Sequence, residues 1–184
     1  MIKTALIVED LPDVAEWLKQ RLEDIFPDIV VHHAASIKDA MRHLVLPSID
    51  LALIDLGLPD GRGETIIRQI KERKSETLCV VTTIFDDADH LFPALRAGAD
   101  GYLLKDEADH EFTASLRGIM DGRPPLSSSI ALQVLEYFRP CRNEQVQLTN
   151  RERDVLHLIA NGLSVKQAAD SLGLKPNTVS GYMK

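Results

Sequence analysis

Short apolar runs alternate with amphipathic stretches along the first two-thirds of the chain. The apolar runs, which predict strands, are Thr4–Val8, Ile29–His33, Leu51–Asp55, Leu78–Thr82 and Gly101–Leu104. Apolar residues at helical spacing predict helices at about Val14–Ile25, Ile37–Leu46, Glu64–Lys74, Leu91–Ala97 and Ala108–Met120. This alternation favours an α/β domain, a doubly wound parallel sheet of five strands with helices on both faces. An all-helical domain is excluded because the runs are too short and too uniformly apolar.

Two features bear on where the helices begin. Ser36 and Asp106 stand where the N-caps of the second and fifth helices are expected. Pro93 falls inside the fourth helical stretch, where it cannot donate a backbone hydrogen bond and clashes with the preceding turn. We therefore expect that helix to begin late, near Leu91–Pro93, or to be kinked.

The alternation stops at the sequence DGRPPLSSS, Asp121–Ser129, which is typical of a domain boundary. One amphipathic helix over Ile130–Phe138 follows, and a polar loop comes after it. These features predict a first domain at residues 1–121 and a linker with one helix at residues 122–147.

The last part of the chain, residues 148–184, predicts three helical pieces, namely Arg151–Ala160, Val165–Leu172 and Asn177–Lys184. Thr149 and Glu152 form the pattern of a capping box at the first piece. Gly173 makes the turn between the other two. Because two short helices joined by a glycine-containing turn are typical of a helix-turn-helix, this part is predicted to be a small all-α domain.

Composition and charge narrow the class of protein. Apolar residues make up 45% of the chain, but no apolar run approaches the ~18 residues of a membrane span, and the N-terminus lacks a signal peptide. We therefore expect a cytoplasmic protein with no membrane partner. Up to Pro125 the net charge is −9, from 14 basic and 23 acidic residues, whereas the remainder carries +2, from 7 and 5. Only the second part is suited to bind nucleic acid, and only weakly.

Polar side chains follow the predicted strands at the points where they end. These residues are Glu9 and Asp10 after the first strand, Asp55 at the third, Thr82 and Thr83 at the fourth, and Lys105 after the fifth. In an open sheet of order 2-1-3-4-5, the first and third strands are neighbours at the switch point, where ligands bind. We therefore expect these side chains to share one crevice. The histidines, by contrast, are interpreted as surface or packing residues.

The expected crevice has a definite chemistry. Three carboxylates in one pocket repel one another, and a hard divalent cation such as Mg²⁺ relieves that repulsion. A carboxylate such as Asp55 can also attack phosphorus and form an aspartyl-phosphate. Lys105 would then hold a phosphoryl oxygen.

The motifs LIVED, ALIDLGLPDGRG, VVTT and AGADGYLLKD resemble those of a response-regulator receiver domain, over residues 1–121. The resemblance implies a flavodoxin-like fold and an Mg²⁺ or Mn²⁺ cofactor. It implies that Asp55 is the phospho-acceptor and that Thr83 and Lys105 contact the phosphoryl group. For the metal, it implies that Asp10 and Asp55 are direct ligands, that Gly57 gives its backbone carbonyl, and that Glu9 acts mainly through water. It also implies that Thr83 and Tyr102 form the switch. In the family the aromatic residue turns inward on activation. Ile84 departs from the pattern, since a small residue is usual there beside the acceptor.

The C-terminal pattern resembles a LuxR-type DNA-binding domain, and the whole chain resembles the NarL/FixJ family of transcriptional regulators. The resemblance implies that Ser180, Gly181 and Lys184 face bases, with Lys166, Thr178 and Tyr182 near phosphates. Family members continue beyond the position of Lys184, so we expect a shortened chain or a cleavage product. We expect the intact protein to bind promoter DNA, alone or as a homodimer, and this chain to bind it poorly because phosphate contacts dominate DNA affinity.

These features predict a two-component response regulator that a sensor histidine kinase phosphorylates on Asp55. It would be no enzyme beyond assisting its own phosphorylation and dephosphorylation. One alternative is an interaction-only signalling regulator with a non-functional DNA-binding part. A phosphohydrolase is disfavoured because Gly57 stands where such enzymes usually place a second acid. A flavin-binding domain is disfavoured because EDLPD offers no phosphate-cradling loop after the first strand.

Overall fold

A computed structural model describes residues 2–45, 48–74, 76–139 and 149–181. The chain divides into two compact units, Met1–Phe138 and Arg139–Lys184. The helix predicted within a linker belongs to the first of these units. Each unit has a hydrophobic core of its own.

The first unit is built on a parallel sheet of five strands in the order β2-β1-β3-β6-β7, which confirms the predicted fold and strand order. The strands are β1 (Thr4–Val8), β2 (Val30–Ala34), β3 (Leu51–Ile54), β6 (Leu78–Thr83) and β7 (Gly101–Leu104). A small antiparallel hairpin of β4 (Gly57–Leu58) and β5 (Gly61–Arg62) follows β3 and was not predicted.

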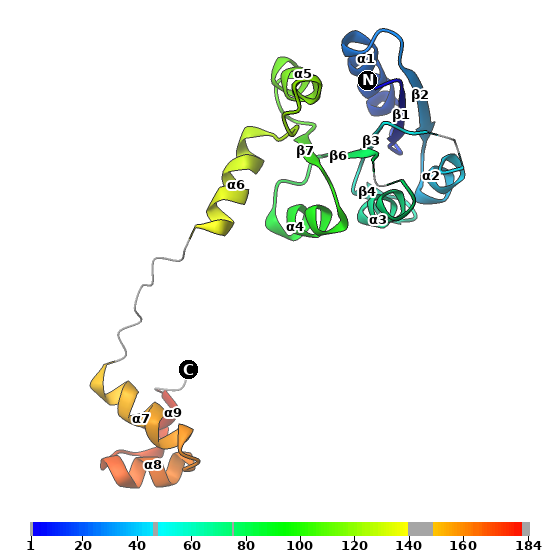
Figure 1. The fold of residues 1–184 in the computed structure, drawn as a ribbon. Coiled ribbons are helices and arrows are strands. Elements are labelled where there is room, and N and C mark those ends of the chain that lie inside the picture. The colour runs from blue at the N-terminus through cyan, green and yellow to red at the C-terminus, as the bar shows by residue number, and fades with distance from the viewer. Residues whose placement is uncertain (1, 46–47, 75, 140–148, 182–184) are drawn as a thin grey trace. The chain divides into compact units, whose positions relative to one another are not determined.

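Helices cover both faces of this sheet. They are α1 (Pro12–Ile25), α2 (Ile37–His43), α3 (Glu64–Arg73), α4 (Ala88–Ala97) and α5 (Asp109–Arg117), with a 3₁₀ turn at Gly118–Asp121. Figure 1 shows α1 and α5 on one side of the strands and α2, α3 and α4 on the other. Because side chains alternate along a strand, Ile7 and Leu53 join the core under α1 and α5, whereas Val8 and Ile54 join the other. Among the described helices, none is long and apolar enough to cross a bilayer.

The predicted late start of the fourth helix and the predicted N-cap Asp106 are wrong, whereas the predicted start of the fifth helix at about Ala108 agrees with the observed start at Asp109. Helix α4 begins at Ala88 rather than near Leu91, because the Asp87 carboxylate caps it by accepting the backbone N–H of His90 at 3.1 Å. Pro93 therefore lies inside the helix. Asp106 is not an N-cap, because the chain turns through residues 105–107 before α5 starts behind Ala108. The predicted cap Ser36 is confirmed, since its hydroxyl accepts the N–H of Asp39.

The segment after the 3₁₀ turn continues the sheet beyond its edge strand. The N–H of Tyr102 donates to the carbonyl of Pro125 at 2.8 Å, and the N–H of Ser127 donates to the carbonyl of Tyr102 at 3.0 Å. The buried hydroxyl of Ser127 also accepts the N–H of Leu104 at 2.9 Å. Residues 125–127 are thereby joined to β7 by three hydrogen bonds.

Helix α6 (Ser128–Phe138) packs on the same part of the unit. Ile130 is fully buried in the core that contains α4. The side-chain amide of Gln133 donates to the carbonyl of Asp86 at 2.5 Å, and the ring of Tyr137 lies 4.1 Å from that of Phe92 in α4. The predicted linker helix is thus attached to both β7 and α4.

The second unit contains α7 (Asn150–Ala160), α8 (Val165–Leu172) and α9 (Pro176–Gly181) around a small core of Val155, Ala168, Ala169 and Val179. The predicted capping box of Thr149 and Glu152 is confirmed, and Ser164 with Gln167 forms a second one that was not predicted. Gly173 ends α8 in the left-handed conformation, at φ 63°. This arrangement provides the predicted helix-turn-helix.

Candidate functional site

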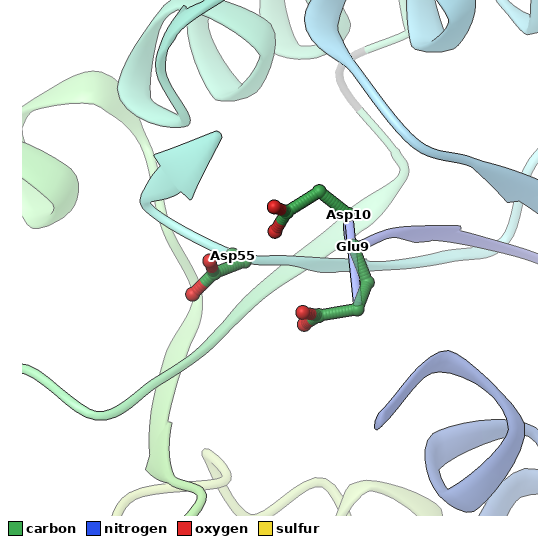
Figure 2. Close-up of side chains that lie close together, drawn as sticks. All are labelled: Glu9, Asp10 and Asp55. Atoms are coloured by element: carbon green, nitrogen blue, oxygen red, sulfur yellow. The ribbon is translucent and has the colours of Figure 1, made fainter. Parts of the chain in front are cut away.

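Three carboxylates meet at the carboxyl ends of β1 and β3, which are neighbours in the sheet. Glu9 and Asp10 follow β1, and Asp55 follows β3. One oxygen atom from each of the three lies within 4.8 Å of the others, and Figure 2 shows the side chains around one space. Glu9 is fully buried and Asp55 is 8% exposed. A set of oxygen donors alone suits a hard divalent cation such as Mg²⁺, so the residues present fit the implied metal.

Lys105 ties two of these acids together from the end of β7. Its Nζ lies 2.5 Å from Oε2 of Glu9 and 3.2 Å from Oδ1 of Asp55. Burial is the largest influence on the Glu9 carboxyl and leaves its pKa above the usual value. The hydrogen bond and charge of Lys105 lower this pKa in part, and the charge of Asp55 raises it. The lysine thus stabilises a carboxylate that burial alone would disfavour.

The backbone after β3 holds Asp55 in place. The N–H of Gly57 donates to Oδ2 of Asp55 at 3.2 Å. A Cβ atom at Gly63 would lie 2.1 Å from the carbonyl oxygen of Asp55, so only glycine fits where the chain returns from the β4–β5 hairpin. Within the described residues the Asp10 carboxylate has no hydrogen-bond partner, and it is therefore available to a ligand.

The predicted switch residues are Thr83, the last residue of β6, and Tyr102, which lies within β7, and both contact Phe85. Thr83 is fully buried, and its hydroxyl accepts the N–H of Phe85 at 3.4 Å. Tyr102 is also fully buried, and its hydroxyl donates to the carbonyl of Phe85 at 2.8 Å. The Phe85 ring stacks on His90, with ring centroids 4.2 Å apart, and a Cβ at Gly57 would lie 3.4 Å from it.

The position of Tyr102 changes one expectation about the switch. Tyr102 is already buried in this structure, so an inward turn on activation cannot bury it further. Ile84, which the resemblance places beside the acceptor, is 66% exposed, and the aromatic ring near Gly57 belongs to Phe85.

The predicted DNA-facing residues lie on the surface of the second unit where the structure describes them. Lys166 on α8 and Thr178, Ser180 and Gly181 on α9 are exposed, while Val179 between them is buried. Tyr182 and Lys184 lie outside the described residues. A Cβ at Gly181 would meet nothing within 4 Å, so packing does not explain this glycine.

The sequence-based interpretation missed one contact of the acid cluster, the group formed by Glu9, Asp10 and Asp55. Nε2 of His33, at the end of β2, lies 2.8 Å from the backbone carbonyl oxygen of Glu9. Histidines were interpreted as surface or packing residues, although β2 neighbours β1 and His33 lies near the same end of the sheet as Glu9. The signal in the sequence was therefore the position of His33 near the end of its strand.

Two family models match the chain. Residues 5–117 match the response regulator receiver domain, and residues 146–184 match the bacterial regulatory proteins of the luxR family. The first match covers more than half of the chain and contains every residue of the acid cluster.

Similar proteins span nearly the whole chain. The transcriptional activator DevR/DosR of Mycobacterium tuberculosis is 30% identical over 190 residues, which cover 100% of this chain and 85% of that protein. The nitrate/nitrite response regulator NarL of Escherichia coli is 32% identical over 186 residues, covering 98% and 86%. A structure of the RcsB response regulator from Salmonella typhimurium has a TM-score of 0.73 at 24% identity, covering 99% and 89%, and shows the shared fold.

A receiver domain followed by a LuxR-type domain implies a kinase partner and binding to DNA. Both parts and their order agree with the motifs at the strand ends and with the helix-turn-helix. The chain belongs to the NarL/FixJ family of response regulators, the transcriptional regulators of two-component systems.

Proposed function

We propose that Asp55 receives a phosphoryl group from a sensor histidine kinase and that this group controls the action of the helix-turn-helix on promoter DNA. One observation carries the proposal. The carboxylate of Asp55 lies within 4.8 Å of those of Glu9 and Asp10, and its Oδ1 lies 3.2 Å from Nζ of Lys105. A nucleophile, oxygen donors for a cation and a fixed positive charge are thus assembled in one place.

In the transfer, an Asp55 carboxylate oxygen forms a bond to phosphorus while the bond from phosphorus to the donor histidine nitrogen breaks. The electron pair of that bond stays on the imidazole. Lys105 neutralises one phosphoryl oxygen. Asp10, Asp55 and the Gly57 carbonyl would hold Mg²⁺ or Mn²⁺ directly, with Glu9 acting mainly through water, and the ion supplies charge neutralisation to the phosphoryl group. The same groups assist hydrolysis of the acyl phosphate, so the receiver takes part in its own dephosphorylation.

The signal leaves the site through Phe85. The Thr83 hydroxyl moves from the N–H of Phe85 to a phosphoryl oxygen, and the Phe85 carbonyl that Tyr102 holds moves with it. Since the backbone of Tyr102 is bonded to residues 125–127, the change passes into α6, which leads along the chain to the second unit. This route replaces burial of the aromatic ring as the essential movement.

The output is binding to DNA in the cytoplasm. Ser180, Gly181 and Lys184 face bases, and Lys166, Thr178 and Tyr182 contact phosphates. A homodimer is the binding form. Support comes from the exposed face of α9 and from a structure of two RcsB dimers bound to two parallel DNAs, a fold relative at 24% identity.

The experiment is phosphorylation of the full chain by acetyl phosphate with Mg²⁺, followed by intact mass. We expect one phosphoryl group on the wild type, none on Asp55→Asn, because an amide is a poor nucleophile, and none when EDTA removes the metal. The matched control is Asp86→Asn, which changes an exposed aspartate near the site and should leave incorporation unchanged. Equal incorporation in Asp55→Asn and wild type would contradict the proposal.

A further inference from the structure

Two adjacent histidines lie near the end of β2 and point to opposite faces of the sheet, as successive residues of a strand do. The ring of His32 lies 5.5 Å from that of His43 in α2. His33, on the other face, places its Nε2 atom 2.8 Å from the backbone carbonyl oxygen of Glu9. The two side chains are alike in chemistry and differ in what they contact.

The direction of the His33 hydrogen bond is fixed by its partner. A carbonyl oxygen only accepts, so Nε2 of His33 must carry the proton and donate it. Both the Nε2-protonated neutral ring and the charged ring satisfy this contact. Nε2 therefore cannot bind a metal while it carries this proton, and the group of side chains that could hold an ion consists of Glu9, Asp10 and Asp55.

The backbone N–H and the backbone carbonyl of Glu9 are both hydrogen-bonded to residues near the end of β2. Its backbone N–H donates to the carbonyl of Ala34 at 3.0 Å, and its carbonyl accepts from His33. The carbonyl of Glu9 and the N–H of Asp10 belong to one planar peptide group. The His33 contact therefore fixes the direction in which the backbone leaves β1 at Asp10.

Asp10 depends on this backbone anchor more than its neighbours do. Glu9 and Asp55 are bonded to Lys105, whereas the Asp10 carboxylate has no hydrogen-bond partner within the described residues. Its direction is therefore set chiefly by the peptide group that His33 holds. Removing an outer partner of a metal ligand typically weakens metal affinity by about 10- to 100-fold.

We propose that His33 is a positioning residue for the metal site, acting through the Glu9–Asp10 peptide to aim Asp10 at the ion. The inference rests on the proposed function, because the metal site is part of it. It deepens that function by adding a residue from the edge strand β2, which contributes no carboxylate and no phosphoryl contact.

The test replaces His33, in the full chain, by two residues whose side-chain amides lie at different distances from the backbone. His33→Gln places an N–H near the position of Nε2, and His33→Asn carries the same amide one bond shorter. His32→Gln is the matched control on the opposite face of the same strand. We expect the Mg²⁺ dissociation constant, followed by calorimetry, to rise about 10-fold in His33→Asn and to stay within about 2-fold of wild type in the other two.

The outcomes separate this inference from the proposed function. Unchanged Mg²⁺ affinity in His33→Asn, beside normal binding by the wild type, would overturn the positioning role and leave the metal site standing. Equal losses in His33→Gln and His33→Asn would also overturn it, since the donor would not matter. A wild type that binds no Mg²⁺ would instead refute the metal site itself.

A measurement on the wild type keeps the inference testable if a variant unfolds. In ¹⁵N-labelled protein, the Nε2–H of His33 should give an observable signal with slowed exchange, because the proton is held by the Glu9 carbonyl. A rapidly exchanging Nε2–H, or a ring protonated only on Nδ1, would overturn the assignment.

Discussion

Replacing Ser127 by alanine removes the hydroxyl that joins the start of α6 to β7. The Ser127 side chain is fully buried, and its Oγ accepts the N–H of Leu104 at 2.9 Å. Alanine leaves that N–H buried without its acceptor, which costs about 1–3 kcal/mol of unfolding free energy. For a unit of the size of Met1–Phe138, such a loss lowers Tm by about 3–10 °C.

The assay is thermal unfolding together with amide exchange at Leu104. Ser129→Ala is the matched control, because Ser129 lies two residues later, near the start of α6, with its side chain exposed. We expect the control to keep the wild-type Tm and Ser127→Ala to lower it and to speed exchange at Leu104. Equal Tm values and equal exchange in the two variants would show that the Ser127 hydroxyl does not hold the N–H of Leu104, and would refute the reasoning that this contact fastens the start of α6 to β7.

Three further predictions concern the switch and the backbone around Asp55. In the wild type, we expect phosphorylation to change amide exchange more over residues 84–97 than in α1. Thr83→Ala should accept a phosphoryl group yet lose most of this change. An unchanged response in Thr83→Ala would mean that the signal takes another route. Burial raises the pKa of Tyr102 above its ordinary value, so the neutral phenol contributes fully to the free energy of unfolding below pH ~10, and this contribution declines as the pH rises further. Denaturant unfolding between pH 8 and 11 (roughly the window around the ordinary tyrosine pKa) should therefore show a smaller decline in unfolding free energy for Tyr102→Phe than for the wild type. Gly63→Ala should destabilise the first unit by about 1–3 kcal/mol in urea unfolding, whereas Gly118→Ala, whose Cβ would meet nothing closer than 3.5 Å, should be milder.

The parallel sheet and the acid cluster could be predicted because both follow from short-range patterns. Alternation of strands and helices fixes the fold class, and the carboxyl ends of parallel strands meet at one edge of the sheet. Glu9, Asp10, Asp55 and Lys105 could therefore be brought together from their positions after apolar runs, and the structure places them within a few ångströms of one another.

The features that escaped prediction depend on tertiary contacts. The early start of α4 depends on a cap from Asp87 that outweighs the expected effect of Pro93. The contact of His33 with Glu9 joins residues 24 positions apart, and it requires the register of β1 and β2 to be known. The attachment of α6 likewise depends on Ser127 meeting Leu104 across 23 positions. Helical periodicity reveals that a helix exists, but not which surface it packs against.

Mapping the phosphoryl group to a single residue tests the central claim most directly. Borohydride reduces an aspartyl-phosphate to homoserine, and one tryptic peptide, residues 43–62, contains Asp50, Asp55 and Asp60. Asp50 accepts the N–H groups of Lys3 and Thr4, and Asp60 those of Ile37 and Lys38, so both carboxylates are internal controls with structural partners. After treatment with acetyl phosphate and Mg²⁺ and then with borohydride, sequencing of this tryptic peptide should find homoserine at position 55 alone. Homoserine at position 50 or 60, or conversion outside this peptide with position 55 intact, would contradict the account.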